Sequence, residues 1–216
     1  VLNALVAGYI FLLMPEYLLR FIAFIATRCV YRFKVRGEEN IPLKGPAILV
    51  CNHVSFVDPV LLMAASPRPI AFIMDHRIFK TPVLGWLFKL GKAIPIAARS
   101  EDEAVYEQAF ARARQVLDNG DLLCIFPEGA LTRDGQLAEF KGGIMKLLET
   151  HPVPVVPLAL QNLWGSFFSR IDGAPMKTPF RRGLFSRVGL VAGAAVPADS
   201  VTPEGLRERV AQLLNA

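Results

Sequence analysis

The sequence predicts an α/β fold, and three observations support this. After residue 34, short apolar runs rich in β-branched residues alternate with amphipathic helical patterns, which is typical of a sheet with helices packed on it. The length of 216 residues suits one continuous core. A hydrophobic fraction of 53% and a mean hydropathy of +0.38 exclude a disordered chain and favour a globular protein associated with a membrane.

Residues 1–33 are interpreted as an N-terminal apolar helical membrane anchor, ahead of one domain at 34–216. A helix over residues 1–14 would be about 21 Å long, short of the ~30 Å hydrocarbon core, so two short helices that meet near Pro15 are expected. The second, at 16–31, would lie in the membrane interface. Its apolar stripe would consist of Leu18, Phe21, Ile22 and Ile25. The end of a longer transmembrane helix and a buried core helix stay open as alternatives.

Strands and helices alternate along the rest of the chain. Strands are expected at 47–51, 70–74, 93–96, 122–126, 155–160 and 187–192, and helices at 59–65, 83–90, 101–118, 143–150 and 203–215. The longest helix begins with acidic residues and stops at Asn119-Gly120, whereas the last begins with Thr202 as N-cap and Pro203 in its first turn. The irregular segment 165–183 is expected to be a long surface loop.

The net charge of +5 favours an anionic partner, which can be a lipid head group, a phosphate or a nucleic acid. A basic cluster interleaved with phenylalanines is the best local support for nucleic acid. It contains Arg170, Lys177, Arg181, Arg182 and Arg187 with Phe167, Phe168, Phe180 and Phe185. The same pattern suits an interfacial membrane contact or a solvated loop, and the apolar N-terminal segment favours the membrane. We therefore expect membrane phospholipids as partners and no nucleic acid.

The three cysteines are expected to be reduced core thiols in a protein that faces the cytosol. Cys29, Cys51 and Cys124 each lie in an apolar run, and their number is odd. The sequence has no clear cluster of metal ligands, so no metal and no prosthetic group are expected.

The first candidate site lies directly after the strand at 47–51, where His53 and Asp58 are separated by four residues. Strand-to-helix junctions of this kind place side chains at the end of a sheet, where α/β sites usually form. An imidazole can take a proton from a hydroxyl near neutral pH, and a nearby carboxylate can fix its tautomer. A structural interpretation is equally open, with Asp58 as an N-cap before Pro59 and His53 as a satisfied buried histidine.

The second candidate site follows the strand at 122–126 and contains Glu128. Its carboxylate can bind a substrate hydroxyl or a cation, and the alternative is a solvated turn. Basic residues are expected around it, at Arg99, Arg133 and Lys141. Such side chains on one rim suit a phosphate-bearing substrate, although each alone is typical of a surface charge.

These residues resemble the conserved blocks of the glycerolipid acyltransferases, which include 1-acylglycerol-3-phosphate and lysophospholipid acyltransferases. Asn52-His53 to Asp58 is similar to the NHxxxxD block, 126–129 to FPEG, 140–143 to FKxG and 153–157 to VPVVP. The blocks stand in the family's order across residues 35–165. The resemblance implies the glycerolipid acyltransferase fold, a mixed β-sheet flanked by helices.

The resemblance also implies a role for each matching residue in a direct acyl transfer. His53 would be the general base on the free glycerol hydroxyl of a lysophospholipid, and Asp58 would orient it. Acyl-CoA or acyl carrier protein would supply the acyl group as co-substrate. Asn52, Arg99, Glu128, Gly129, Arg133 and Lys141 would bind the acceptor, and Pro157 would shape the acyl-donor pocket.

Two departures bear on the acceptor. The FPEG block usually continues with Thr-Arg-Ser, whereas Leu131 stands here where the arginine is expected. A Lys-x-Glu-Leu element is replaced by the sequence at 75–78. Because a phosphomonoester favours a full set of cationic contacts, lysophospholipid is the expected acceptor and 1-acylglycerol-3-phosphate the alternative.

With these departures, the chain resembles acyltransferase domains of the lysophospholipid-salvage type, some of which follow a transporter domain. The expected location is the cytoplasmic face of the inner membrane. A hydrolase is disfavoured because the sequence has no G-x-S-x-G elbow. A lipid-binding module without catalysis is the alternative from another class, and substitution of His53 separates it from an enzyme.

Overall fold

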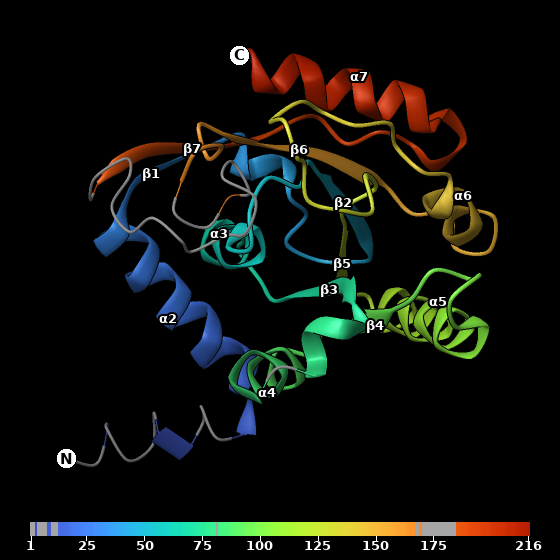
Figure 1. Ribbon diagram of the computed structural model, residues 1–216, viewed down its shortest axis with the longest axis horizontal. Coiled ribbons are helices and arrows are strands. Elements are labelled where there is room, and N and C mark those ends of the chain that lie inside the picture. The colour runs from blue at the N-terminus through green and yellow to red at the C-terminus, as the bar shows by residue number, and fades with distance from the viewer. Residues whose placement is uncertain (1–2, 4–7, 10–12, 81, 167–168, 170–184) are drawn as a thin grey trace.

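A mixed seven-stranded sheet forms the centre of the protein (Figure 1). The computed structural model describes residues 3, 8–9, 13–80, 82–166, 169 and 185–216. The strand order is β1-β7-β6-β2-β5-β3-β4; β6 and β7 are antiparallel and all other neighbours are parallel. The strands are β1 (Tyr31–Arg36), β2 (Ala47–Cys51), β3 (Ile70–Asp75), β4 (Ile94–Ile96), β5 (Leu122–Ile125), β6 (Val155–Gln161) and β7 (Ser186–Ala192).

Helices cover both faces of this sheet. α2 (Pro15–Val30) and α3 (Asp58–Ala65) lie on one side, and α7 (Pro203–Leu214) lies on the other (Figure 1). α5 (Glu103–Asp118) and α6 (Gly143–Leu148) pack on the same face as α7, and α4 (Pro82–Leu90) follows the short turn η2 (His76–Lys80). Two further single turns are η1 (Glu38–Asn40) and η3 (Ala198–Ser200).

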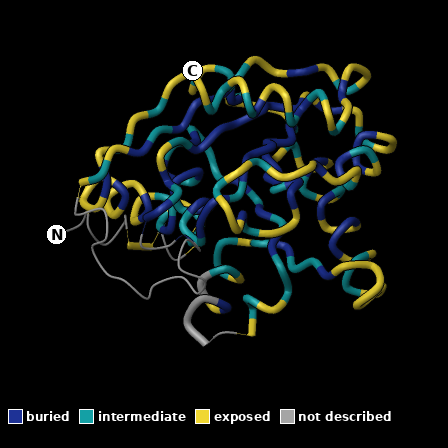
Figure 2. Tube along the Cα trace, turned by 45° about the horizontal axis from the view of Figure 1, so that its top comes forward, coloured by how far each residue is buried: buried dark blue, intermediate teal, exposed yellow. Residues whose placement is uncertain are grey.

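Two apolar clusters fill the spaces between the layers, because alternate residues of each central strand face opposite sides. In β2, Leu49 packs on the α3 side, whereas Ile48 and Val50 pack on the α5 and α7 side. All residues of β2 and β5 are buried, as expected for parallel strands covered on both faces. Figure 2 shows these central strands as the buried interior of the molecule.

The six expected strands and five expected helices are all present, with ends that move by at most two residues. β1 is the strand that the sequence analysis missed. Its sequence alternates polar and apolar residues over Tyr31–Arg36, and its pairing with β7 extends the sheet at an edge. The predicted helix 16–31 therefore ends at Val30, and the predicted domain boundary between residues 33 and 34 falls inside this strand.

The N-terminal segment is described mainly from Leu13 onward, so most of the predicted first helix lies outside the described residues. α2 begins at Pro15, where the break was predicted. Its buried stripe, Leu19, Ala23 and Thr27, is on the side that contacts α3. Of the predicted interfacial stripe, Phe21, Ile22 and Ile25 are exposed and Leu18 is half-buried. In the described part of the chain, no helix combines the length and apolar character that crossing a bilayer requires.

Two further expectations meet the structure only in part. Cys51 and Cys124 are buried, but Cys29 is exposed on α2, because the helix turns it away from the sheet. The predicted loop 165–183 and the basic cluster at 167–187 lie largely outside the described residues, which include only Phe185 and Arg187 of that cluster.

Candidate active site

The turn between β2 and α3 is fixed at its start by Asn52. Its side-chain oxygen accepts a hydrogen bond from Leu160 N at 2.8 Å, and its Nδ2 donates to Leu160 O at 3.1 Å. Both ends of the amide are therefore bonded to the backbone of β6. Asn52 lies at the predicted site, and its geometry is that of a residue that positions the turn.

The carboxylate of Asp58 forms hydrogen bonds with several groups of the same turn. The side chain is fully buried, and its Oδ2 lies 2.8 Å from His53 Nδ1. The carboxylate also accepts hydrogen bonds from Val54 N at 2.7 Å, from Ser55 N at 3.0 Å and from Ser55 Oγ at 3.0 Å. Val57, and not Asp58, occupies the N-cap position of α3. The N-cap interpretation is thus wrong, and the aspartate faces backward onto the histidine.

The His53 imidazole is held on two sides. Its Nδ1 meets the Asp58 carboxylate, and its ring stacks on Phe126 with centroids 4.2 Å apart. Because a carboxylate only accepts hydrogen bonds, it favours the tautomer with the proton on Nδ1, which leaves Nε2 as the basic nitrogen. The side chain is 22% exposed, so the ring remains accessible.

Glu128 links the turn after β5 to the turn after β2. Its Oε1 accepts a hydrogen bond from His53 N at 2.7 Å, and its Oε2 accepts one from Ala138 N at 2.9 Å. Burial raises the pKa of this carboxyl, and the two backbone donors oppose that effect. The solvated-turn interpretation is wrong for Glu128, because only 6% of the residue is exposed.

Gly129 and Lys141 are in close contact beside Glu128. Gly129 has a φ of +71°, and a Cβ at this position would overlap the end of the Lys141 side chain. The glycine therefore provides both the left-handed turn and the space over which the lysine side chain passes. The backbone also joins these segments, since Lys141 N donates to Pro127 O at 2.9 Å. Of the basic residues expected around Glu128, Lys141 therefore lies at the second turn.

The loop that closes the site is held from α7 by Arg207, a residue that the sequence analysis missed. Arg207 Nε donates to Ala138 O and its Nη2 donates to Leu137 O, both at 3.0 Å. Ala138 N in turn donates to Glu128. A chain of hydrogen bonds thus runs from the C-terminal helix to the backbone of His53. No local pattern in the sequence signals it, because Arg207 lies 69 residues from Ala138.

A cavity of about 110 Å³ lies beside the two turns. Its lining combines polar and apolar side chains, among them His53, Glu128, Thr132, Leu137, Leu163 and Trp164. Trp164 covers Gly135, where a Cβ would lie 2.7 Å from the indole ring. Thr132 N donates to His53 O at 2.9 Å and so ties this loop to the first turn. An apolar wall beside a basic nitrogen and a carboxylate suits an amphiphilic substrate.

The lining of this cavity does not include the predicted site residues Arg99, Arg133 and Pro157. Arg99 is exposed and forms an ion pair with Glu103 at 2.6 Å. Arg133 is exposed on the loop after the second turn. Pro157 is buried in β6, where Gly193 N donates to its carbonyl oxygen at 2.9 Å. Within the described ranges, no group of three or more His, Cys, Asp or Glu side chains is arranged to hold a metal ion.

The fold has a close counterpart among solved structures. The 1-acyl-sn-glycerophosphate acyltransferase PlsC from Thermotoga maritima superposes with a TM-score of 0.65 over 92% of this chain and 76% of that chain. The two sequences are 24% identical. This likeness concerns the fold, a mixed sheet flanked by helices.

Two proteins that are similar in sequence are named as 1-acyl-sn-glycerol-3-phosphate acyltransferases. A chloroplastic 1-acyl-sn-glycerol-3-phosphate acyltransferase of Arabidopsis thaliana is 31% identical over 133 residues, 61% of this chain and 36% of the relative. A 1-acyl-sn-glycerol-3-phosphate acyltransferase of Pseudomonas aeruginosa is 31% identical over 177 residues, 82% of this chain and 64% of the relative. The chain thus spans less than two thirds of the length of each of these relatives.

The family model described as Acyltransferase matches residues 32–161. That span runs from β1 to the end of β6 and contains both turns of the site. Since the match covers more than half of the 216 residues, the chain belongs to the acyltransferase family.

Proposed function

We propose that this chain transfers an acyl group from an acyl thioester to the free glycerol hydroxyl of a lysophospholipid. The observation that carries the proposal is the His53–Asp58 pair, in which a buried carboxylate binds Nδ1 at 2.8 Å and leaves Nε2 for the substrate. An imidazole oriented in this way suits general-base catalysis on a hydroxyl. Membership of the acyltransferase family supports the reaction type.

In the proposed mechanism, the acceptor oxygen attacks the thioester directly. His53 Nε2 takes the hydroxyl proton as the oxygen forms a bond to the thioester carbonyl carbon. The carbon–sulfur bond then breaks, and the imidazolium gives its proton to the departing thiolate, which leaves as the free thiol. Asp58 stabilises the imidazolium and holds the ring orientation throughout. Acyl-CoA or acyl carrier protein serves as donor, and no further cofactor takes part.

Glu128 is proposed to hold the acceptor side of the site in place. Its two oxygens join the backbone of His53 to the loop at Ala138, so it fixes the distance between the base and the cavity. Gly129 and Lys141 lie beside Glu128 on the same side of the site, and Arg133 lies on the loop that follows. A cationic side chain at the wall suits the phosphate of the acceptor.

Two acceptors are supported by different observations. The relatives are named as acyltransferases acting on 1-acyl-sn-glycerol-3-phosphate, which favours a phosphomonoester. Leu131 in place of the family's arginine and the ion pair between Arg99 and Glu103 favour an acceptor that needs fewer cationic contacts. Both share the reacting hydroxyl and the same base.

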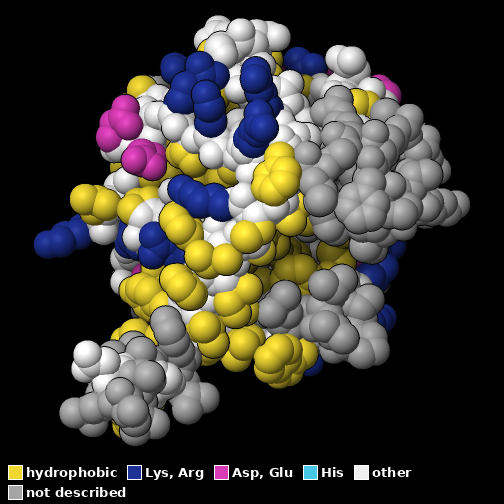
Figure 3. Space-filling view, turned by 90° about the vertical axis from the view of Figure 1, so that its left-hand side faces the viewer, with side chains coloured by type: hydrophobic (Ala, Val, Ile, Leu, Met, Phe, Trp, Pro, Cys, Tyr) yellow, Lys and Arg dark blue, Asp and Glu magenta, His cyan; other side chains and the backbone are white. Residues whose placement is uncertain are grey.

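The protein is proposed to work at the cytoplasmic face of the inner membrane, with α2 as an interfacial anchor. Tyr17, Phe21, Ile22 and Ile25 on α2 are between 44% and 55% exposed. On the face that carries α2, hydrophobic side chains gather beneath a group of Lys and Arg side chains (Figure 3). This arrangement suits an anionic membrane surface, from which acceptor and product need not depart. A transporter domain ahead of the chain is the further proposal that the resemblance supports.

A product assay by mass spectrometry tests the function. Purified protein in liposomes would receive acyl-CoA or acyl carrier protein as donor and a panel of lysophospholipids that includes 1-acylglycerol-3-phosphate. We expect diacyl product, and we expect His53→Ala to reduce its rate by about 10²- to 10⁴-fold. His151→Ala is the matched control, because His151 also pairs with an aspartate, Asp118, at 3.0 Å.

The outcomes separate the alternatives. Product that disappears with His53 and persists with His151 supports the enzyme, and the acceptor consumed fastest identifies the head group. Undiminished turnover in a folded His53→Ala variant would contradict the base. Absence of product from every acceptor, with lipid binding retained, would favour the lipid-binding module.

A further inference from the structure

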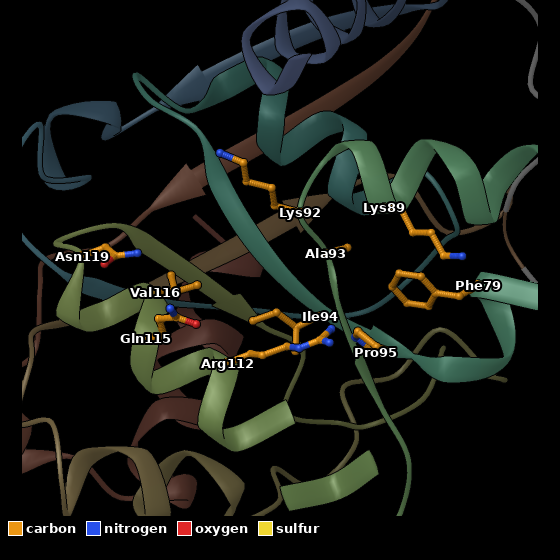
Figure 4. Close-up of a pocket in the computed structure, with 10 residues that line it drawn as sticks. All are labelled: Phe79, Lys89, Lys92, Ala93, Ile94, Pro95, Arg112, Gln115, Val116 and Asn119. Atoms are coloured by element: carbon orange, nitrogen blue, oxygen red, sulfur yellow. The ribbon is translucent and has the colours of Figure 1, made fainter. Parts of the chain in front are cut away.

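A second and larger cavity, of about 370 Å³, lies between α4, β4 and α5. Its lining residues are Phe79, Lys89, Lys92, Ala93, Ile94, Pro95, Arg112, Gln115, Val116 and Asn119 (Figure 4). It shares none of them with the cavity at His53. It includes Ile94 of β4, an edge strand, whereas His53 follows β2. The strands β3 and β5 lie between β4 and β2, so the two cavities are at different positions across the sheet.

The charged groups of this groove are all cationic. Lys89, Lys92 and Arg112 line it, and none of its ten lining residues is acidic. Lys92 forms an ion pair with Glu16 of α2 at 2.6 Å, and in Figure 4 its side chain points away from the other two. Among the described residues, Lys89 and Arg112 have no ion-pair partner, so two positive charges remain available at the groove.

The side of the groove formed by α5 also carries neutral hydrogen-bonding groups. Arg112, Gln115, Val116 and Asn119 follow the 3, 4 and 7 spacing of a single helix face on α5, so they align along the groove. Gln115 and Asn119 offer side-chain amides, while Val116 and Ile94 provide an apolar floor. A groove with cationic and amide donors above an apolar floor matches a phosphate group attached to an apolar body.

The surroundings favour a lipid as the source of that phosphate. Trp86, which is 64% exposed, lies one turn before Lys89 on α4. The Lys92–Glu16 ion pair connects the groove to α2, whose outer face is apolar. An exposed tryptophan followed by lysines is typical of a segment at the boundary between acyl chains and head groups.

We propose that the groove between α4, β4 and α5 is a binding site for the phosphate of an anionic phospholipid head group, separate from the acyl-transfer site. Lys89 and Arg112 bind the phosphate, and the amides of α5 contact the head group. The site holds the α4 side of the protein at a negatively charged membrane surface. Binding at this site strengthens the association of the protein with the membrane and leaves the chemistry at His53 unchanged.

Vesicle flotation of the full chain tests this assignment. Vesicles of phosphatidylcholine alone are compared with vesicles of phosphatidylcholine mixed with phosphatidylglycerol. We expect tighter binding to the mixed vesicles, and we expect the variant K89Q/R112Q to lose about ten- to thirty-fold of that affinity. The matched control is K44Q/R209Q, which removes the same charge from exposed positions outside the groove. An equal loss in the control would overturn the proposal, because it would show diffuse attraction without a site.

Two further measurements locate the site. Dihexanoyl phosphatidylglycerol, titrated below its micelle concentration, should shift the amide resonances of Arg112, Gln115 and Asn119, and inorganic phosphate should shift the same resonances more weakly. An absence of shifts at these residues, or tighter binding of coenzyme A than of the lipid, would overturn the lipid assignment. Turnover of K89Q/R112Q in detergent should match that of the unaltered chain. A loss there would instead place the groove in the catalytic site, whereas failure of the proposed acyl transfer itself would leave the binding results unaffected.

Discussion

The hydrogen bond that orients the His53 ring comes from Asp58 in the same turn, whereas the turn after β5 is held by groups from distant parts of the chain. In the first turn, the Asp58 carboxylate binds His53 Nδ1 and accepts hydrogen bonds from Val54 N, Ser55 N and Ser55 Oγ. In the second, Glu128 is bonded to His53, 75 residues away, and to Ala138, which Arg207 holds in turn. The base is therefore oriented locally, while the wall opposite it is assembled by the tertiary fold.

This difference separates two kinds of failure. Loss of a bond inside the first turn affects the orientation of the catalytic ring itself. Loss of a bond around Glu128 alters the distance between ring and cavity and leaves the ring orientation intact. Substitutions in the two turns should therefore differ in their balance between activity and stability.

The largest effect is expected from Asp58→Asn. The amide cannot serve as acceptor to all of Nδ1, Val54 N and Ser55 N, and it can face His53 with the wrong tautomer. The rate should fall by about 10²- to 10⁴-fold, as measured by product formation. Ser55→Ala is the control, since it removes only the hydroxyl donor and should cost about 1 kcal/mol of stability with most activity retained. Activity near that of the unaltered chain in Asp58→Asn would contradict local orientation.

A smaller effect is expected from Glu128→Gln. One carboxylate oxygen becomes an NH₂ group that faces a backbone N–H, so a buried donor loses its partner. We expect about 1–3 kcal/mol of lost stability and a rate reduced by up to about 10²-fold through misplacement. Denaturant unfolding and product formation measure these two quantities. Glu139→Gln, at an exposed position of the same loop, should change neither.

Arg207→Gln tests the distant support of the second turn. The shorter side chain loses its paired donation to Leu137 and Ala138, so the loop loosens and Glu128 is held less firmly. The rate should fall a few-fold and stability by about 1 kcal/mol. Because the Ala138 N–H lowers the pKa of Glu128, the acid limb of the rate profile should move to higher pH. Arg209→Gln, on the exposed side of α7, should leave the profile in place.

The pH dependence of stability sharpens the same comparison. Burial raises the pKa of Glu128 in the folded state above its ordinary value. The stability associated with this group is thus fully present below the ordinary glutamate pKa and is lost as the pH rises through the raised folded value. The difference in unfolding free energy between the unaltered chain and Glu128→Gln should decrease across that window. A difference that is independent of pH would contradict the burial effect.

The smallest functional effect is expected from thiol modification. Burial raises the pKa values of Cys51 and Cys124, so these thiols are both inaccessible and protonated. A thiol reagent should label Cys29 alone in the folded protein and all three cysteines after unfolding, with activity retained after the first reaction. Rapid labelling of Cys51, which precedes the first turn, would show that this turn opens.

Much of the fold could be predicted from sequence because the signals are local. The strands that became β2, β5 and β6 are continuous apolar runs, and the ends of α5 and α7 carry their own caps at Asp102 and Thr202. β1 was missed because its alternating pattern follows a helix directly and its partner, β7, lies more than 150 residues away. An edge strand of this kind is defined by its partner more than by its own sequence.

The α/β core and the two polar turns at strand ends could be predicted from sequence. So could the pairing of His53 with Asp58, because a bond across five residues needs only the local path of the chain. The packing of distant segments brings Asn52 onto β6 and places Arg207 of α7 on the loop that holds Glu128. Those contacts depend on which distant segments pack together. Packing is set by the burial of whole faces of the sheet, and no short motif encodes it.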